Sequence, residues 1–244
     1  RAEVYVNGRC VGIHEGGYDD FSYDITPQLQ QSGEQELIVG VYDPGSARAI
    51  TTGKQSNSKF EEPAGFSYSP SSGIWQTVWL EPVPDLHIQD VHLTPDIDEE
   101  LLAVEVNVSQ KDPPALVEIQ VKDGEKIVGE AAGLYNNRVD VPVPDPRLWS
   151  PDDPFLYDVT VILKDSSGTV LDHVDSYAGM RKIEIRNTIV AGKRGNQRQI
   201  KQIYLNNKFL FQMGPLDQGY WPDGLYTAPT DEALRWDVAK IKEF

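Results

Sequence analysis

Apolar and polar residues alternate along most of the first 212 residues of the chain. Runs such as "VYVNGRCVGIH", "LLAVEVNVS" and "FLYDVTVIL" make about every second side chain apolar. This period of two is typical of β-strands that bury one face. No helical periodicity interrupts these runs, and polar turn residues separate them at short intervals. The pattern therefore predicts a mainly β protein built from β-sandwiches.

Three short turn signals divide this β region into hairpins. Asn7-Gly8, Asp123-Gly124 and Asn206-Asn207 each stand between two alternating runs. Such pairs favour tight hairpin turns because Asn, Asp and Gly tolerate the positive φ angles that both central positions require. We therefore expect three two-residue β-hairpins.

One helix is predicted, near the end of the chain. Thr230 is a suitable N-cap, and Asp231 and Glu232 follow it at the positive end of the helix dipole. The apolar residues expected on one face of this helix are Ala233, Leu234, Trp236, Val238 and Ile241.

The amino-acid composition excludes several classes of partner and of functional site. With 38 acidic and 22 basic residues, the 244-residue chain has a net charge of −16, which argues against nucleic acid and anionic membrane surfaces as partners. No apolar run reaches the about 18 residues of a membrane helix. Cys10 is the only cysteine, and we found no nucleotide-binding or zinc-protease motif. We expect no cofactor and no metal, since the four histidines are scattered: His14, His87, His92 and His173.

Two stretches indicate boundaries. "EPVPDLHI" at 81–88 has prolines between two strand signals, as interdomain linkers often do. "RNTIVAGKRGNQRQIKQ" at 186–202 carries the main cluster of positive charge; we interpret it as a solvated hairpin, with a basic binding patch as the alternative. The first residues already alternate like a strand and include no initiating Met, so we expect a fragment of a longer protein.

Several motifs occur in an order and spacing that resemble glycoside hydrolase family 2, which contains β-galactosidases, β-glucuronidases and β-mannosidases. The resemblance covers essentially the whole chain. The motifs are "VYVNGRCVGIHEGGYDDFSYDIT", "SGIWQTVWLEPV", "DPRLWSPDDPFLYDVTVIL", and "YAGMRKIEI" followed by "YLNNKFLFQMGPLDQGYWPDGLYTAPTDEAL". The resemblance implies an incomplete jelly-roll sandwich of the sugar-binding type at 1–84 and an immunoglobulin-like sandwich at 85–186. It further implies that 187–244 contain a hairpin or linker and then the first strand and helix of a TIM barrel.

We interpret the first three motifs as having structural rather than chemical roles. We expect Ile74, Trp75, Val78 and Leu80 to fill a core, and Leu148 with Trp149 to close the end of a sandwich. As the alternative, aromatic rings such as Trp75 and Tyr68 could stack on sugar rings.

The last motif supplies the candidate site. We interpret Phe209–Gln212 as the first barrel strand, which places "PLDQGYWPDGLYT" at the face where TIM barrels build their active sites. Asp217 is expected to accept hydrogen bonds from sugar hydroxyls, and Trp221 or Tyr220 to stack on a sugar ring. Asp223 is a further substrate-binding candidate. The alternative is that Asp217 and Asp223 cap turns while the aromatic residues pack against the sandwich domains.

The same loop departs from one family pattern. β-Galactosidases of the family usually carry an Arg-His-Glu-type run where this chain has Leu216, Asp217 and Gln218. That difference weakens the case for galactose as the sugar.

No residue of the chain is assigned a catalytic role. Retaining glycosidases need two carboxyl groups about 5–5.5 Å apart, and the resemblance implies that both follow Phe244. Adjacent acidic residues such as Asp19-Asp20 and Asp152-Asp153 would point to opposite faces of a strand. We therefore expect the non-catalytic N-terminal portion of a retaining exo-β-glycosidase, β-galactosidase-like, that hydrolyses terminal β-linked sugars.

A second function class stays open. The alternative is a non-catalytic carbohydrate-binding or adhesion module made of two sandwiches. In both cases the expected partner is a carbohydrate, and a homo-oligomer stays open.

Overall fold

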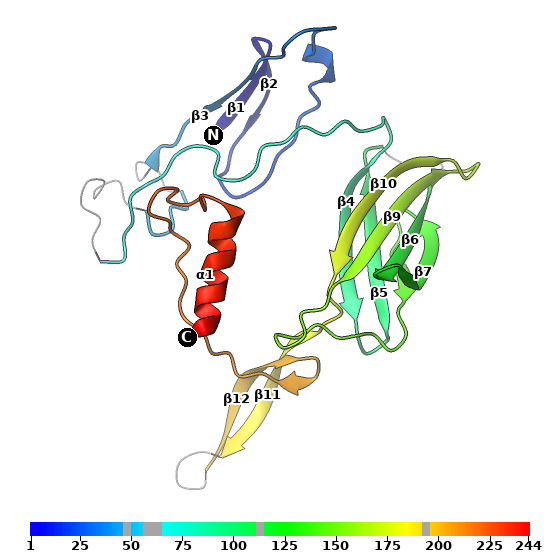
Figure 1. The fold of residues 1–244 in the computed structure, drawn as a ribbon, viewed down its shortest axis with the longest axis vertical. Helices are drawn as coiled ribbons and strands as arrows, with labels where there is room; N and C mark the ends of the chain where they lie inside the picture. Colours follow the sequence, from blue (N-terminus) through cyan, green and yellow to red (C-terminus); the bar gives the residue numbers. More distant parts are fainter. Residues whose placement is uncertain (46–49, 56–64, 111–114, 192–195) are drawn as a thin grey trace. The chain divides into compact units, whose positions relative to one another are not determined.

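The structure is a computed structural model that describes residues 1–45, 50–55, 65–110, 115–191 and 196–244. The chain divides into two compact units. The first consists of Arg1–Leu80 together with Gly214–Phe244, and the second of Glu81–Met213. The described residues form thirteen strands, one α-helix and one 3₁₀ helix, so the prediction of a mainly β protein is confirmed (Figure 1). None of the described helices is long and apolar enough to cross a membrane.

The first unit contains a three-stranded antiparallel sheet in the order β2-β1-β3. Its strands are β1 (Ala2–Val6), β2 (Arg9–His14) and β3 (Leu37–Val41). Ala2, Val4 and Val6 are buried, as the alternation predicts. Asn7 and Gly8 have φ angles of 50° and 77°, so the predicted hairpin turn between β1 and β2 is confirmed.

Much of the remainder of the first unit is irregular. Among the described residues of 1–80, the 3₁₀ helix η1 (Thr26–Gln28) is followed only by β3, and no strand forms in "QTVWLEP". The expectation that Ile74, Val78 and Leu80 fill a core is wrong, because all three side chains are exposed. An apolar alternation becomes a strand only where a neighbouring strand supplies backbone partners and a face to bury, and the described part of this unit offers 74–80 neither.

The second unit contains a sandwich of two antiparallel sheets, one of four strands in the order β10-β9-β6-β7 and one of three in the order β4-β5-β8. The strands are β4 (Ile88–Asp96), β5 (Leu101–Val108), β6 (Ala115–Asp123), β7 (Lys126–Leu134), β8 (Val139–Pro142), β9 (Tyr157–Asp165) and β10 (Val170–Ala178). The predicted hairpin between β6 and β7 is present. Its turn lies one residue later than expected, because Asp123 pairs with Lys126 and leaves Gly124 in the turn.

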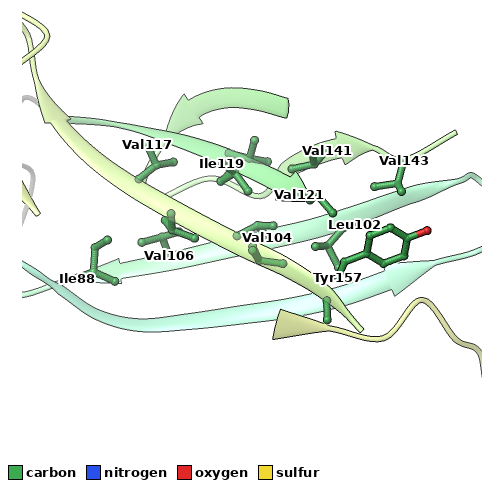
Figure 2. Close-up of a cluster of buried hydrophobic side chains, with 14 of the residues drawn as sticks. Ile88, Leu102, Val104, Val106, Val117, Ile119, Val121, Val141, Val143 and Tyr157 are labelled. Carbon is green, nitrogen blue, oxygen red and sulfur yellow. The ribbon is translucent and has the colours of Figure 1, made fainter. Parts of the chain in front are cut away.

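The core of this sandwich follows the period of two. On β6 and β9, every second side chain is buried between the sheets, including Ile119 and Leu163, which are fully buried. Figure 2 shows the labelled valines and Ile119 of β6 facing Leu102 and Val104 of β5 across the core. Tight interdigitation of apolar side chains from both sheets is the main stabilising feature of such a sandwich.

A proline-rich connection closes one end of the sandwich, as predicted. Leu148 packs against the core, and the backbone N–H of Trp149 donates to the Met180 carbonyl at 2.9 Å. The guanidinium of Arg181 lies 4.7 Å from the centre of the Trp149 ring. The side-chain amide of Asn206 donates to the Trp149 carbonyl at 3.0 Å, which ties the following hairpin to this end.

That hairpin consists of β11 (Ile183–Ala191), β12 (Gln197–Leu205) and β13 (Lys208–Phe209). Asn206 and Asn207 have φ angles of 49° and 65°, so this predicted turn is also confirmed. The predicted strand at Phe209–Gln212 is not confirmed. Only Phe209 of that range is in a strand, and it pairs antiparallel with Tyr204. The Asn-Asn turn sends Lys208 and Phe209 back along β12, so these two residues belong to the antiparallel hairpin.

The predicted helix is present as α1 (Asp231–Glu243). The Thr230 hydroxyl accepts a hydrogen bond from the Ala233 N–H at 3.1 Å, which confirms the N-cap. None of the helix side chains is buried, and Leu234, Trp236 and Val238 are at least half exposed. The apolar face of α1 is therefore uncovered by the described residues.

Candidate functional site

The candidate site is the loop Gly214–Thr230, which belongs to the first unit together with Arg1–Leu80. Asp217 is exposed, and its Oδ1 accepts a hydrogen bond from the Gly219 N–H at 2.8 Å. This contact closes a small turn in which Gly219 adopts a φ of 69°. Among the described residues, Oδ2 of Asp217 accepts no hydrogen bond. The carboxylate therefore has one oxygen that supports the loop and one that can accept from a ligand.

Gln218 is fixed by two donors from a distant part of the chain. Its Oε1 accepts from the Tyr68 hydroxyl at 2.6 Å and from the Lys54 ammonium at 2.9 Å. A side-chain carbonyl has two lone pairs, so these two donors satisfy it. The contact attaches the start of the loop to the segments around 54 and 68.

Tyr220 continues the same attachment. Its ring stacks on the ring of Tyr68, with the centroids 4.0 Å apart and the planes 9° from parallel. Burial raises the pKa of the Tyr220 hydroxyl, and the neighbouring tyrosines, Tyr226 first, add to the effect. Like any phenol, the hydroxyl is protonated near neutral pH and can donate a hydrogen bond.

Trp221 and Asp223 lie in the next turn. The backbone of Trp221 forms a two-way bridge with Leu225, at 2.7 and 3.1 Å, which folds residues 221–225 into a tight hairpin. Oδ1 of Asp223 accepts from the Gly224 N–H at 3.2 Å. A β-carbon at Gly224 would lie 1.9 Å from the Thr227 carbonyl oxygen, so only glycine fits there.

The end of the loop packs on Trp75. The Tyr226 ring meets the Trp75 ring edge-on at 4.8 Å, and the Thr227 hydroxyl donates to the Trp75 carbonyl at 2.9 Å. The Trp75 indole in turn donates to the Gly17 carbonyl at 2.8 Å. The loop is thus attached at both its beginning and its end.

The structure therefore brings all four predicted residues into one loop and assigns each a structural contact. Asp217 and Asp223 cap turns and Tyr220 packs on Tyr68, as the alternative interpretation proposed; these contacts do not test sugar binding. Sequence reasoning missed the roles of Lys54 and Gln218. No local signal reveals this pair, because its members are 164 residues apart in the sequence.

A general acid of a glycosidase needs a raised carboxyl pKa. Four carboxyl groups of the described residues instead have a lowered pKa, each chiefly because a side-chain donor bonds to the carboxylate: Asp24, Asp98, Asp153 and Asp165. The described residues also contain no cluster of His, Cys, Asp and Glu suited to a metal ion.

Comparisons with known proteins show what this chain is similar to. Residues 86–181 match the model of the glycosyl hydrolases family 2. A β-galactosidase of Halalkalibacterium halodurans is 30% identical over 203 residues, which are 78% of this chain and 18% of that protein. A putative β-glucuronidase of Formosa agariphila is 29% identical over 195 residues, which are 76% of this chain and 22% of the relative.

A solved structure shows the same fold. The crystal structure of Bacteroides uniformis β-glucuronidase matches 99% of this chain and 29% of its own chain, with a TM-score of 0.72 and 23% identity. This chain therefore spans less than a third of each of these relatives. The chain belongs to glycoside hydrolase family 2.

Proposed function

We propose that this chain is the non-catalytic N-terminal portion of a retaining exo-β-glycosidase that hydrolyses a terminal β-linked sugar. The observation that carries the proposal is the match of residues 86–181 with the family 2 model. The names of the relatives suggest a β-galactoside or a β-glucuronide as the substrate. The parent protein would be an O-glycosyl hydrolase, β-galactosidase-like, that acts through a covalent glycosyl-enzyme.

We further propose the domain roles that the resemblance implies. Residues 1–84 would be a sugar-binding-type jelly roll and 85–186 an immunoglobulin-like sandwich. The four-stranded and three-stranded sheets of β4–β10 support the second assignment, because immunoglobulin-like folds pack two antiparallel sheets of this size. Residues 187–244 would hold a hairpin and the beginning of the catalytic barrel, for which the capped helix α1 after the loop is the support.

Within this proposal, the loop forms one wall of the sugar site. Asp217 would accept a hydrogen bond from a sugar hydroxyl through Oδ2, and the half-buried Trp221 would stack on the sugar ring. Tyr220 and Asp223 would lie at its edge. The support for this assignment is the combination of a carboxylate oxygen that no described residue uses with a loop attached at both ends.

Substitution of Asp217 or Trp221 by alanine in the protein that carries this chain tests the assignment. Asp217→Ala should lower kcat/KM by roughly 10- to 150-fold, which corresponds to the about 1.5–3 kcal/mol of a hydrogen bond to a charged group. Trp221→Ala should also lower kcat/KM, because the ring that stacks on the sugar is lost. Asp217→Ala should leave the protein folded, since only a solvent-exposed turn contact is lost. Steady-state kinetics with a nitrophenyl β-glycoside measures the effect.

Matched controls exist in the same unit. Asp20→Ala removes an exposed carboxylate and Trp79→Ala an exposed indole, neither of which belongs to the loop. Both controls should keep wild-type kinetics. Unchanged kinetics in both loop variants would refute the assignment of these residues to the sugar site.

A non-catalytic carbohydrate-binding or adhesion module is the second candidate. The observation in its favour is that both carboxylates of the loop, Asp217 and Asp223, accept a hydrogen bond from a backbone N–H of their own turn. Such a module would bind a sugar without hydrolysing it. A panel of β-glycosides incubated with the protein that carries this chain separates the two, because only the glycosidase releases product.

A further inference from the structure

We propose that Tyr68 is a positioning residue of the sugar loop, which it holds through its hydroxyl and its ring at the same time. This inference rests on the proposed function, because the loop matters for activity only if it contacts a sugar. Tyr68 itself would not touch the sugar. Its role would be to fix the segment Gln218–Tyr220, between the two residues assigned to the sugar, Asp217 and Trp221.

The position of Tyr68 is itself defined by backbone contacts. Its N–H donates to the Lys54 carbonyl at 2.9 Å, and Gln55 forms a parallel bridge with Tyr68. Oε1 of Gln55 accepts from the N–H of Ser71 at 2.7 Å and from its hydroxyl at 3.2 Å. The segments 52–55 and 68–71 therefore lie side by side, and the side chains of Lys54 and Tyr68 converge on one acceptor.

That acceptor is Oε1 of Gln218. The Tyr68 hydroxyl contacts it at 2.6 Å and the Lys54 ammonium at 2.9 Å. The ammonium carries a full charge, which strengthens its hydrogen bond relative to a neutral pair. The backbone of the segments 52–55 and 68–71 sets the directions of these two donors. Together they restrict the Gln218 side chain, which in turn restricts the backbone just after Asp217.

The ring of Tyr68 adds a second restraint two residues further on. It stacks on Tyr220 at 4.0 Å, so one side chain holds both residues that flank Gly219. Gly219 has a φ of 69° and donates its N–H to Asp217 at 2.8 Å. Because Tyr68 holds Gln218 and Tyr220 on either side of Gly219, it fixes the shape of this turn. The shape of the turn in turn sets the direction of the Asp217 carboxylate.

Two substitutions separate the hydroxyl from the ring. Tyr68→Phe keeps the stack on Tyr220 and removes the hydrogen bond, whereas Gln218→Leu removes the acceptor for both donors. Gln218→Glu keeps an acceptor oxygen at the same place and should therefore behave like the wild type. Tyr42→Phe is the matched control, because the hydroxyl of Tyr42 forms no hydrogen bond with any residue that the structure describes.

Hydrogen exchange of the chain is the primary readout. In Tyr68→Phe and in Gln218→Leu, the amides of Gly219 and Trp221 should exchange roughly 3- to 10-fold faster, the range expected for the loss of one net hydrogen bond. Gln218→Glu and Tyr42→Phe should leave both rates unchanged. The double variant Tyr68→Phe with Gln218→Leu should exchange no faster than Gln218→Leu alone, since both changes remove the same contact.

Kinetics of the protein that carries this chain is the second readout. A loss of positioning should raise KM by roughly 3- to 10-fold with little change in kcat, because the sugar would be held less well in the ground state and the transition state alike. The Gln218→Glu variant should restore the wild-type KM.

The outcomes distinguish this inference from the proposed function. Unchanged exchange of Gly219 and Trp221 in both Tyr68→Phe and Gln218→Leu would overturn the role of Tyr68, whatever the activity. Faster exchange with an unchanged KM would also overturn it, since the loop would then be ordered without consequence for the sugar. A wild-type protein that hydrolyses no β-glycoside would refute the glycosidase itself, while a faster exchange would still show that Tyr68 holds the loop.

Discussion

Purified as a polypeptide of these 244 residues, the chain is expected to release no product from any nitrophenyl β-glycoside. Two-carboxylate catalysis requires an acid and a nucleophile about 5–5.5 Å apart, with the pKa of the acid raised. The loop offers Asp217 and Asp223 instead, and each of them accepts a hydrogen bond from a backbone N–H of its own turn. The adjacent pair Asp152-Asp153 is also unsuitable, since Asp153 is ion-paired with Arg147 at 2.6 Å.

The expected effect is a complete loss of the enzymatic rate acceleration. Enzymes accelerate reactions by typically about 10⁶- to 10¹⁷-fold, and glycoside hydrolysis without a carboxylate pair loses that acceleration. The assay compares the chain with a mock preparation over a panel of β-galactosides, β-glucuronides and β-mannosides. Product formation above the mock that co-purifies with the chain would show that a catalytic pair exists within it and that the assignment is wrong.

Leu102→Ala should destabilise the sandwich of the second unit strongly. Leu102 lies on β5 with none of its surface exposed, and it packs between the two sheets (Figure 2). Removing three carbon atoms from such a position leaves a cavity and typically costs about 2–5 kcal/mol. Urea unfolding of the chain, followed by circular dichroism of the β-sheet signal, measures the loss.

Leu116→Ala is the matched control. The same atoms are removed from β6 of the same sandwich, but the side chain is 45% exposed, so no cavity forms in the core. Its effect should stay below about 1 kcal/mol, because little buried surface is lost. Equal destabilisation by the two variants would mean that the sheets do not pack through the face that the burial pattern defines.

The parts of the fold that could be predicted from the sequence are those with local causes. The turns at Asn7-Gly8 and Asn206-Asn207 form because those residues accept positive φ angles. The alternation of apolar and polar residues in β6 and β9 is present in the structure because one face of each strand is buried. Likewise, the helix begins where Thr230 can cap it.

The parts that could not be predicted depend on partners distant in the sequence. The apolar residues of 74–80 alternate like a strand but find no strand to pair with among the described residues. Phe209 does pair, but antiparallel with the strand before it, and the predicted strand does not continue to Gln212. The propensity for extended structure therefore predicted the conformation of single segments better than it predicted which segments pair with one another.

The candidate site shows the same division. The turn-capping contacts of Asp217 and Asp223 follow from residue type and were anticipated as the alternative to sugar binding. The attachment of the loop through Tyr68 and Lys54 was not anticipated, because it joins residues 150 and 164 positions away from Gln218. Whether Asp217 and Trp221 contact a sugar stays a prediction.

The central claim is that this chain is part of a retaining β-glycosidase, and the anomeric form of the first product tests it most directly. Proton NMR follows the sugar released from a nitrophenyl β-glycoside by the protein that carries this chain. A retaining mechanism passes through a covalent intermediate and releases the β-anomer first, with the α-anomer appearing later by mutarotation. Release of the α-anomer first, or no hydrolysis of any β-glycoside in the panel, would contradict the account.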